Sequence, residues 1–376
     1  MRWSMLTEWG NRLVNLGAEF AAIGPVHRRR LSDIGIRIAI SGVRGKSTAT
    51  RWLHEICYER DYDTYAKLTG VEPISLYNDS VYEIDRSAKV QLYENEQEIR
   101  QFNPIDVAIV ENQGIRQYTT RLVNEQFVRP HVIFITNIRK DHLDTLGENR
   151  PKIARSLARA VPAATHVVCG EQDPTMREYL QAELDRRDAA LTYVHVPEEY
   201  ETVPGAEIVY GLNPVLQAVD EPPIESDKLD DFLERMSLSW TRLPNGRIYN
   251  AASANDIEST ELIRRRLVDD ETIQPLLYLR DDRRGRTASF RRYLDGLARR
   301  NAIKQARIIG RGRKTFQRHA SFPIVTHDEE SETPAEVLDE ALADGWPVVV
   351  MGNTVSEFLD GLAESIECRQ AGMAER

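Results

Sequence analysis

The segment Gly-Val-Arg-Gly-Lys-Ser-Thr, residues 42–48, has residue types and a spacing that could bind an anion. An apolar run at 36–40 precedes it and a helix-like pattern follows. A helix that begins after such a turn presents unpaired N–H groups and the positive end of its dipole, which together suit a phosphate. The spacing is shorter than the full Gly-x-x-x-x-Gly-Lys-Ser/Thr motif, because Ile40 stands five residues before Gly45. The alternative is a turn that only tightens the packing of strand against helix. That alternative does not explain a lysine at the start of the helix, where an ammonium group suits a bound anion.

Two further apolar runs end in side chains of the kinds that bind metal ions. They lead into Glu111 and into the group Asn137, Asp141, His142 and Asp144. Because parallel strands deliver their ends to one edge of an α/β sheet, we expect Ser47, Glu111 and His142 to meet there. A hydroxyl, a carboxylate and an imidazole beside a triphosphate could hold Mg²⁺. Each residue alone has a structural alternative, since Asp and Asn at strand ends commonly cap helices and a lone His is often structural.

The elements that must position these residues follow an alternating α/β pattern. Buried parallel strands are predicted at 36–40, 106–110, 131–136 and 165–169, and a second series at 274–279, 305–310 and 347–352. The predicted fold class is α/β, with a P-loop parallel-sheet domain followed by a smaller Rossmann-like α/β domain. We place an N-terminal segment at 1–33 and the two domains at 34–240 and 241–376, with the boundary between about residues 235 and 245.

Composition restricts the class of protein. The chain has 376 residues, of which 41% are hydrophobic and 29% charged, the balance of an ordinary soluble enzyme. Its net charge of −10 argues against general nucleic-acid binding. The three scattered cysteines form neither a metal-spaced pair nor an even disulfide framework, so a reducing, cytoplasmic compartment is expected.

Residues 3–23 carry an apolar stripe at spacings of three and four, interrupted by Glu8, Arg12 and Glu19. The basic run His-Arg-Arg-Arg follows at 27–30. No stretch reaches the roughly 18 apolar residues of a membrane span. A helix packed on the main domain is one interpretation, and an interfacial helix whose basic flank meets anionic lipid or a membrane partner is the other. We therefore expect a cytoplasmic protein, with attachment to the inner face of the cell membrane left open.

Taken together, these segments resemble the Mur ligase superfamily of ATP-dependent amide ligases. The loop SGVRGKST is similar to the short phosphate loop of that family, and TNIRKDHLD resembles its Asn-x-x-x-Asp-His-x-Asp motif. The resemblance is nearest to the ligase subunit of poly-γ-glutamate synthase, and it covers roughly residues 34–355. The segments that match this subunit, in order, are GVRGKSTATR, KLTG at 67–70, NIRKDHLDTLG, NAASANDIEST and LRDDRRGRT.

Several positions depart from the superfamily pattern. About 33 residues precede the first strand, too few for the uridine nucleotide domain of the peptidoglycan ligases, so a nucleotide-sugar substrate is not expected. Ser156 stands where many Mur ligases have a carbamylated lysine, and Lys152 is nearby but out of register. Ala251 replaces the aspartate of the C-terminal motif. The hydrophobic anchor that usually begins the synthase subunit is reduced to the interrupted stretch at 3–23.

The resemblance implies that ATP phosphorylates a carboxylate and that an amine attacks the acyl phosphate, giving an amide, ADP and phosphate. It assigns Ser47, Glu111 and His142 to Mg²⁺, and Asn213 to adenine, with helix capping as the alternative for Asn213. Arg242 or Arg247 is expected to reach ATP on domain closure. The implied nucleotide-binding set is Gly42, Val43, Arg44, Gly45, Lys46, Ser47, Thr48, Asn137, Asn213 and Arg242.

The resemblance also implies a catalytic set that extends into the C-terminal domain: Lys46, His142, Asn255, Asp256, Arg283 and Arg286. Asn255 and Asp256 would contact the acyl phosphate or the incoming amine, and a turn is their structural alternative. The arginines from 280 to 286 suit a polyanionic substrate, because guanidinium groups pair bidentately with carboxylates. A solvated face is the alternative for this cluster.

The implied substrate is glutamate or a poly-γ-glutamate acceptor, with ATP and Mg²⁺ as cofactors. A homo-oligomer and small membrane subunits of a polymer synthase complex are the expected partners, and nucleic acid is not. Two alternatives stay open. One is a related Mur-type ligase that uses a different amino acid or acceptor. The other is an ATP-binding assembly protein with a decayed ligase site, which Ser156 and Ala251 allow.

Overall fold

The computed structural model describes residues 24–70, 73–85, 92–114, 116–140, 146–254, 256–268, 271–280, 284–352 and 356–374. The chain divides into two compact units. The first comprises Met1–Glu198 and Gly205–Leu233, and the second comprises Glu199–Pro204 and Glu234–Arg376. The short 3-10 turn η2 (Glu198–Tyr200) lies where the chain first passes from one unit to the other. The domain boundary expected between about residues 235 and 245 stays a prediction.

The first unit is built on an eight-stranded sheet with the order β4-β3-β2-β5-β1-β6-β7-β8. All neighbours from β2 to β8 pair in parallel, whereas β3 and β4 form an antiparallel hairpin at one edge. The predicted parallel strands of this unit are confirmed as β1, β5, β6 and β7. The strands are β1 (Ile36–Ser41), β2 (Thr64–Leu68), β3 (Ile74–Tyr77), β4 (Ser80–Glu83), β5 (Val107–Glu111), β6 (Val132–Ile135), β7 (His166–Cys169) and β8 (Leu191–Tyr193).

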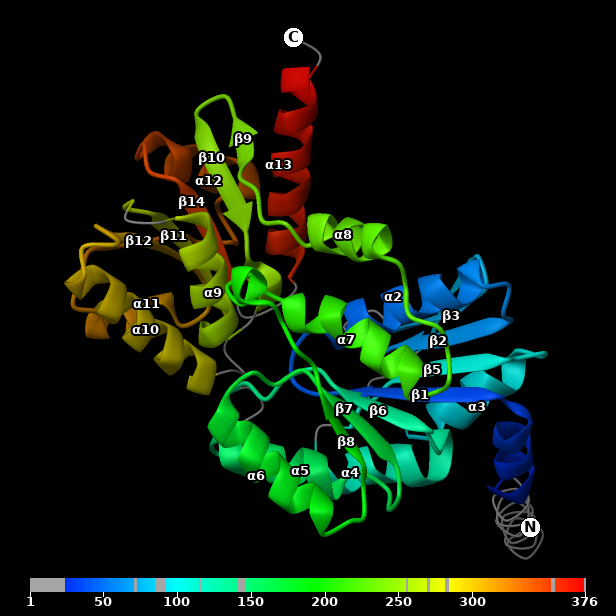
Figure 1. The fold of residues 1–376 in the computed structure, drawn as a ribbon. Coiled ribbons are helices and arrows are strands. Elements are labelled where there is room, and N and C mark those ends of the chain that lie inside the picture. Colours follow the sequence, from blue (N-terminus) through cyan, green and yellow to red (C-terminus); the bar gives the residue numbers. More distant parts are fainter. Residues whose placement is uncertain are drawn as a thin grey trace, which may run out of the picture. The chain divides into compact units, whose positions relative to one another are not determined.

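Helices cover both faces of this sheet, and Figure 1 shows α2 and α7 on one side with α4, α5 and α6 on the other. The central strands are therefore buried on both faces, which is why they read as continuous apolar runs. Residues 24–33 are also helical. The other helices are α2 (Lys46–Glu59), α3 (Glu94–Gln101), α4 (Gln117–Leu122) with its π-helical continuation η1 (Val123–Val128), α5 (Arg150–Arg159), α6 (Pro174–Asp185), α7 (Ala206–Gln217) and α8 (Ser226–Arg235).

The second unit has a six-stranded sheet with the order β13-β12-β11-β14-β10-β9, in which only the β9–β10 pair is antiparallel. The second predicted series of strands is confirmed as β11, β12 and β14. The strands are β9 (Thr241–Leu243), β10 (Gly246–Asn250), β11 (Gln274–Leu279), β12 (Ala306–Gly310), β13 (Ile324–Thr326) and β14 (Val348–Gly352).

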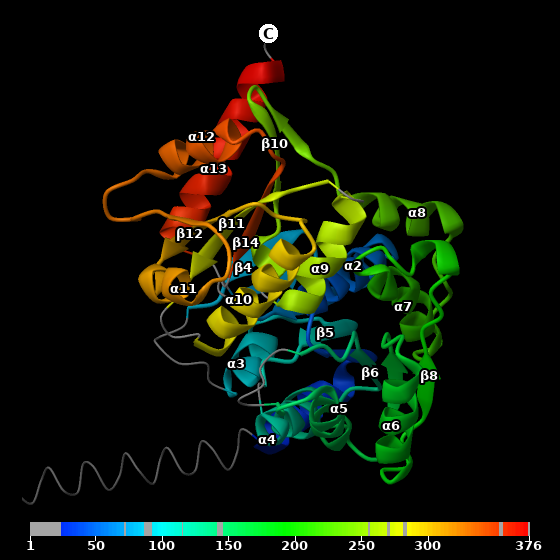
Figure 2. The ribbon, with the colours of Figure 1, turned by 90° about the vertical axis from the view of Figure 1, so that its left-hand side faces the viewer.

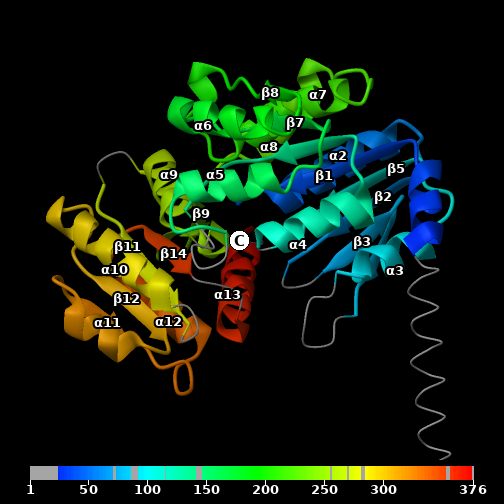
Figure 3. The ribbon, with the colours of Figure 1, turned by 90° about the horizontal axis from the view of Figure 1, so that it is seen from below.

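Two apolar clusters lie on opposite faces of this second sheet. One contains Phe290 and Phe316 from the α10 and α11 side, and the other contains Leu338 and Leu362 from the α12 and α13 side. Figures 2 and 3 show α10 and α11 next to each other over the first of these faces. The helices are η3 (Ala252–Ala254), α9 (Ile257–Leu267), α10 (Arg284–Arg299), α11 (Arg313–His319), α12 (Pro334–Ala343) and α13 (Glu357–Ala374).

The N-terminal interpretation is tested only in part. The amphipathic stretch at 3–23 lies outside the described residues. In the helix at 24–33, His27 is buried and its Nε2 lies 2.9 Å from the carbonyl oxygen of Phe127, whereas Arg28 and Arg29 are exposed. Within the described ranges, the helices are all too short or too polar to cross a bilayer.

Candidate nucleotide and metal site

The strand, glycine turn and helix expected around residues 42–48 are present. Gly42 follows β1 with φ 106°, and Gly45 has φ 77° immediately before α2. A Cβ on Gly42 would overlap the Thr136 side chain, and one on Gly45 would overlap Ile208 of α7. Both positions therefore require glycine for conformation and for space. Because Gly45 occupies the N-cap, no side chain caps the first turn of α2, which suits an anion at this helix end.

Asn137 clamps the middle of this loop. Its backbone carbonyl accepts from Val43 N at 3.2 Å, and its side-chain Oδ1 accepts from Arg44 N at 3.1 Å. Its Nδ2 donates to Arg44 O at 3.1 Å, so one side chain satisfies both backbone groups of Arg44. Lys46 folds back over the loop, with Nζ 3.3 Å from the carbonyl oxygens of Gly42 and Val43. The loop conformation is therefore held by the segment that follows β6 as well as by its own glycines.

Ser47 and Glu111 meet at the carboxyl edge of the sheet. Ser47 Oγ donates to Glu111 Oε2 at 2.9 Å, and the same oxygen accepts from Thr69 N at 3.1 Å. Glu111 is buried whereas Ser47 is exposed, so the pair has a closed side and an open side. A hydroxyl and a carboxylate are the hard oxygen donors that Mg²⁺ prefers, so this pair fits the ion. The third residue expected here, His142, lies outside the described residues.

Two charged residues that received no role from the sequence support this edge, although one of them begins the quoted segment KLTG. The first is Lys67 on β2, which is fully buried. Its Nζ lies 2.7 Å from a Glu94 carboxylate oxygen and donates to the amide oxygens of Asn95 at 2.7 Å and Gln113 at 2.5 Å. Lys67 thus ties the strand before Thr69 to the loop after Glu111. A lysine inside the otherwise apolar run of β2 was the available signal.

The second of these residues is Glu207, in the first turn of α7. Its Oε1 accepts from Asn137 Nδ2 at 3.0 Å and from Arg139 Nη2 at 2.9 Å. The neighbouring Ile208 packs against Gly45. The start of α7 therefore supports the phosphate loop from both the polar and the apolar side. No motif marks Glu207, because its partners lie about 70 residues away, with separations of 70 and 68.

Other expected site residues have identifiable structural partners. Asn213 does not cap α7 but lies inside it, where its side chain accepts from Ile224 N at 2.7 Å and donates to Ile224 O at 3.4 Å. Asp256 is the N-cap of α9 and accepts from Ser259 N at 2.9 Å. Arg242 is exposed on β9, and Arg286 is half-buried in α10. Asn255 and Arg283 lie outside the described residues, and the catalytic and binding roles of all these residues stay predictions.

The departures from the Mur ligase pattern also have local structures. Ser156 lies within α5, and its hydroxyl donates to Leu146 O at 2.6 Å. Lys152 faces solvent and contacts Glu148 Oε2 at 2.5 Å. Ala251 is buried in the core of the second unit. Lys152 and Ser156 therefore have ordinary local partners, and Ala251 contributes to packing.

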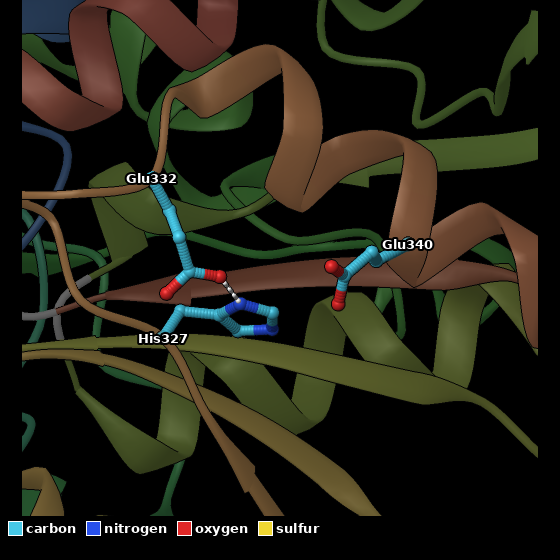
Figure 4. Close-up of side chains that lie close together, drawn as sticks. All are labelled: His327, Glu332 and Glu340. Atoms are coloured by element: carbon cyan, nitrogen blue, oxygen red, sulfur yellow. Dashed lines mark hydrogen bonds and ion pairs between the residues drawn. The ribbon is translucent and has the colours of Figure 1, made fainter.

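A cluster in the second unit has the composition of a metal site but not its electrostatics. His327, Glu332 and Glu340 offer ligand atoms close together, as Figure 4 shows. His327 Nδ1 lies 2.8 Å from Glu332, so this nitrogen carries the proton. The Arg307 guanidinium donates to His327 Nε2 and to Glu340 Oε2, both at 3.0 Å. A cation would meet the positive charge of Arg307 there, so the cluster is best explained as a satisfied structural network.

Comparisons with known proteins agree with the fold and the resemblance. Residues 240–369 match the family model of the poly-gamma-glutamate synthase CapB C-terminal domain. The chain is 25% identical over 337 residues to PGA synthase CapB of Bacillus subtilis (strain 168), covering 84% of this chain and 82% of that protein. It is 26% identical over 152 residues to the capsule biosynthesis protein CapB of Bacillus anthracis, covering 39% of this chain and 33% of that protein.

Solved structures with the same two-part architecture include E. coli FolC in complex with ADP, with a TM-score of 0.64, 17% identity and coverage of 97% of this chain and 98% of that chain. Mycobacterium tuberculosis folylpolyglutamate synthase complexed with ADP gives a TM-score of 0.65 at 17% identity, covering 92% and 93%. At these identities the likeness concerns the fold. The resemblance predicted from the sequence is thus confirmed: residues 240–369 match the CapB C-terminal domain model, and the chain is similar to PGA synthase CapB over most of its length. Its fold is similar to that of the solved folylpolyglutamate synthase structures.

Proposed function

We propose that this protein is an ATP-dependent amide ligase that extends poly-γ-glutamate. The observation that carries the proposal is the Ser47–Glu111 pair beside a clamped phosphate loop, in a chain related to PGA synthase CapB over 84% of its length. The geometry supports phosphate binding and a hard cation at the same sheet edge.

In the proposed reaction, a carboxylate oxygen of the acceptor attacks the γ-phosphorus of ATP, forming an acyl phosphate and releasing ADP. The amine of glutamate then attacks the acyl carbon. The new C–N bond forms, phosphate leaves with the C–O bonding electrons, and the amine nitrogen loses a proton. Bound Mg²⁺ would neutralise charge on the phosphate oxygens.

The residues of the first unit have separate proposed tasks. Lys46 and the N–H groups of residues 42–48 bind the β- and γ-phosphates, where negative charge develops. Ser47 and Glu111, together with His142, hold Mg²⁺. Asn213 approaches adenine. In the second unit, Asn255, Asp256, Arg283 and Arg286 are the proposed contacts for the acyl phosphate and the amine, and Arg242 is a proposed nucleotide contact.

The test is to incubate the protein with ATP, Mg²⁺ and a panel of amino acids, and to measure ADP and phosphate release alongside the masses of the products. We expect glutamate to stimulate release and the product masses to increase by one glutamyl residue at a time. Stimulation by another amino acid alone would support a related ligase. ATP binding without amine-dependent turnover would support a binding protein with a decayed site.

We also propose association with the inner face of the cell membrane, through small membrane subunits, and self-association. The exposed Arg28 and Arg29 support an anionic surface as one partner. Co-sedimentation with vesicles of neutral or anionic lipid tests this, and Arg28→Gln with Arg29→Gln should reduce binding to the anionic vesicles. Light scattering of the purified protein tests the oligomeric state.

A further inference from the structure

Positive charge is concentrated in one segment of this acidic chain. Residues 280–320 contain fourteen arginines and lysines but three acidic residues, whereas the whole chain has a net charge of −10. The arginines from 280 to 286 account for only the beginning of this segment. The remainder lies in α10, β12, α11 and the connections between them, and has no role in the reaction as proposed above.

Part of this charge is exposed on and beside α10 and α11. Phe290, Leu294 and Phe316 are buried against the sheet, which directs the opposite sides of α10 and α11 to solvent. Figure 3 shows the two helices side by side. We call five exposed cations in and beside these helices the α10–α11 basic face: Arg292 in α10, Lys314 and Arg318 in α11, and Lys304 and Arg311 in the connections before and after β12.

The basic face has no carboxylate partners among the residues that the structure describes. Across the part of the chain that the structure describes, no carboxylate lies within ion-pair distance of these five side chains. Nearby cations differ, since Arg300 lies 3.9 Å from Glu261 and Arg313 pairs with Asp328 at 2.5 Å. Asp295, the acidic residue of α10, accepts from Ser321 N at 3.0 Å and from Ser321 Oγ at 2.6 Å. The five cations are therefore available to an external anion.

The chemistry of the surface favours a polycarboxylate over a nucleic acid. Single-stranded nucleic acids are usually held by exposed aromatic rings on which bases stack. Phe290 and Phe316 are instead buried, and Tyr293 is largely buried with its hydroxyl bonded to Glu261. Guanidinium and ammonium groups match the repeated carboxylates of a polyglutamate without needing a ring.

We propose that the α10–α11 basic face binds the growing γ-linked polyglutamate chain as a second, non-catalytic site. This inference rests on the proposed function, because that function supplies the polymer. A chain held here after one addition stays at high effective concentration for the next, so the face favours repeated extension of the same polymer. Exposed ion pairs are individually weak and are screened by salt, so the binding depends on several contacts made together.

The experiment measures binding of fluorescently labelled poly-γ-glutamate to the full chain by anisotropy, without ATP. The test variant is Arg292→Gln, Arg311→Gln, Lys314→Gln and Arg318→Gln combined. The matched control removes four exposed cations from the first unit that have no proposed binding role: Arg51→Gln, Arg100→Gln, Arg116→Gln and Arg129→Gln. We expect Kd to rise about tenfold in the test variant and less than twofold in the control, with wild-type binding weakening as salt increases.

The outcomes separate this inference from the proposed function. Glutamate-dependent ADP release with a short acceptor should be unchanged in the test variant, while the length of polymer made per binding event falls. If the chain makes no amide but binds the polymer through these four residues, the ligase proposal fails and the site stands. Equal losses in both variants, affinity independent of polymer length, or tighter binding of an oligonucleotide of equal charge would overturn the site.

Discussion

Lys67 and Arg292 are both cations of an α/β unit, but their surroundings are opposite. Lys67 is fully buried, and its ammonium lies within 2.7 Å of oxygens from Glu94, Asn95 and Gln113. Arg292 is exposed, and no described residue forms an ion pair with it. A buried charge needs polar or oppositely charged partners inside the fold, because its desolvation costs several kcal/mol. An exposed charge needs none, so it stays available to a ligand.

The same contrast between partnered and unpartnered charges distinguishes the carboxyl edge of the first sheet from the α10–α11 basic face. At the carboxyl edge of the first sheet, Asn137, Glu111 and Glu207 have defined partners before any ligand arrives. Such preorganisation suits phosphoryl transfer, where fixed dipoles stabilise developing charge. The α10–α11 basic face is not preorganised, which suits a flexible polymer in no fixed register. The predictions that follow test this contrast.

The largest effect is expected for Lys46→Ala. The Lys46 ammonium lies against the loop carbonyls and not in a core cluster, so the change should remove transition-state stabilisation without unfolding the protein. We expect turnover to fall by about 1000-fold, with little change in Tm. ADP release and thermal melting should be measured on the same sample. A collapsed melt would assign Lys46 a structural role, and retained turnover would remove it from the site.

Lys67→Met should be the most destabilising of these changes. The substitution removes the Lys67 ammonium from the buried Glu94 carboxylate. We expect the free energy of unfolding to fall by about 3–5 kcal/mol. Denaturant titration measures it. The double variant Lys67→Met with Glu94→Gln should recover part of the loss, since it also removes the buried carboxylate charge that Lys67 contacts in the wild type. A loss below about 1 kcal/mol, or no recovery, would contradict the view of Lys67 as part of a preorganised edge.

Glu111→Gln should raise the Mg²⁺ concentration needed for half-maximal activity by about 10- to 100-fold. A neutral amide can still accept from Ser47 and Thr69, so the fold should be retained while the negative charge is lost. Metal-free binding of ADP serves as the second measurement and should change little. The matched control is Glu98→Gln, which removes a buried carboxylate that accepts from Ser75. An unchanged Mg²⁺ requirement would reduce Glu111 to a packing role.

The fold was largely predictable because its central strands are continuous apolar runs. The runs at 36–40, 106–110 and 131–136 became β1, β5 and β6, and the register between β1 and β5 pairs Ile40 with Glu111. Parallel strands end at a common edge, so the meeting of Ser47 and Glu111 followed from the pattern. Local sequence was sufficient to predict this pair, because each of the two residues lies in or next to an element that the sequence identifies.

The supporting residues could not be predicted in this way. β2 contains Lys67, whose burial depends on partners 28 and 46 residues away. A charge inside a strand is unfavourable until those partners are in place, and nothing local predicts them. Glu207 is similar, because it acts through Asn137 and Arg139. Asn213 follows the same pattern, since its bonds to the backbone of Ile224 depend on the turn after α7.

Glu207→Ala should raise KM for ATP about tenfold and change kcat less. The substitution removes the acceptor that orients Asn137, and so loosens the clamp on Arg44. Glu207→Gln should keep most of the affinity, because its amide oxygen can still accept from Asn137 and Arg139. Steady-state kinetics and fluorescent nucleotide binding measure the difference. If alanine and glutamine behave alike, or kcat alone falls, α7 does not position the loop through this side chain.

The smallest effect is expected at Glu261. Here arginines of the second unit form ion pairs that stabilise the fold. Burial by itself would raise the pKa of Glu261, but hydrogen bonds from Arg264, Arg265 and Tyr293 lower it from 4.5 to about 2. Because the folded-state pKa is lowered, ionised Glu261 stabilises the fold. This contribution is fully present above about pH 4.5 and is lost as the pH falls toward 2. Allowing for solvent screening, the wild type should lose about 1–2 kcal/mol more than Glu261→Gln across this interval.

Urea unfolding of the wild type and Glu261→Gln between pH 5 and pH 2.5 measures this difference. The control is Arg292→Gln, at an arginine that forms no ion pair with any described residue. The two stability curves should converge as acid protonates Glu261, whereas Arg292→Gln should run parallel to the wild type. Parallel curves for Glu261→Gln would mean that its ion pairs contribute nothing to the fold. A pH-dependent loss in Arg292→Gln would mean that the basic face is already paired, and the contrast with Lys67 would fail.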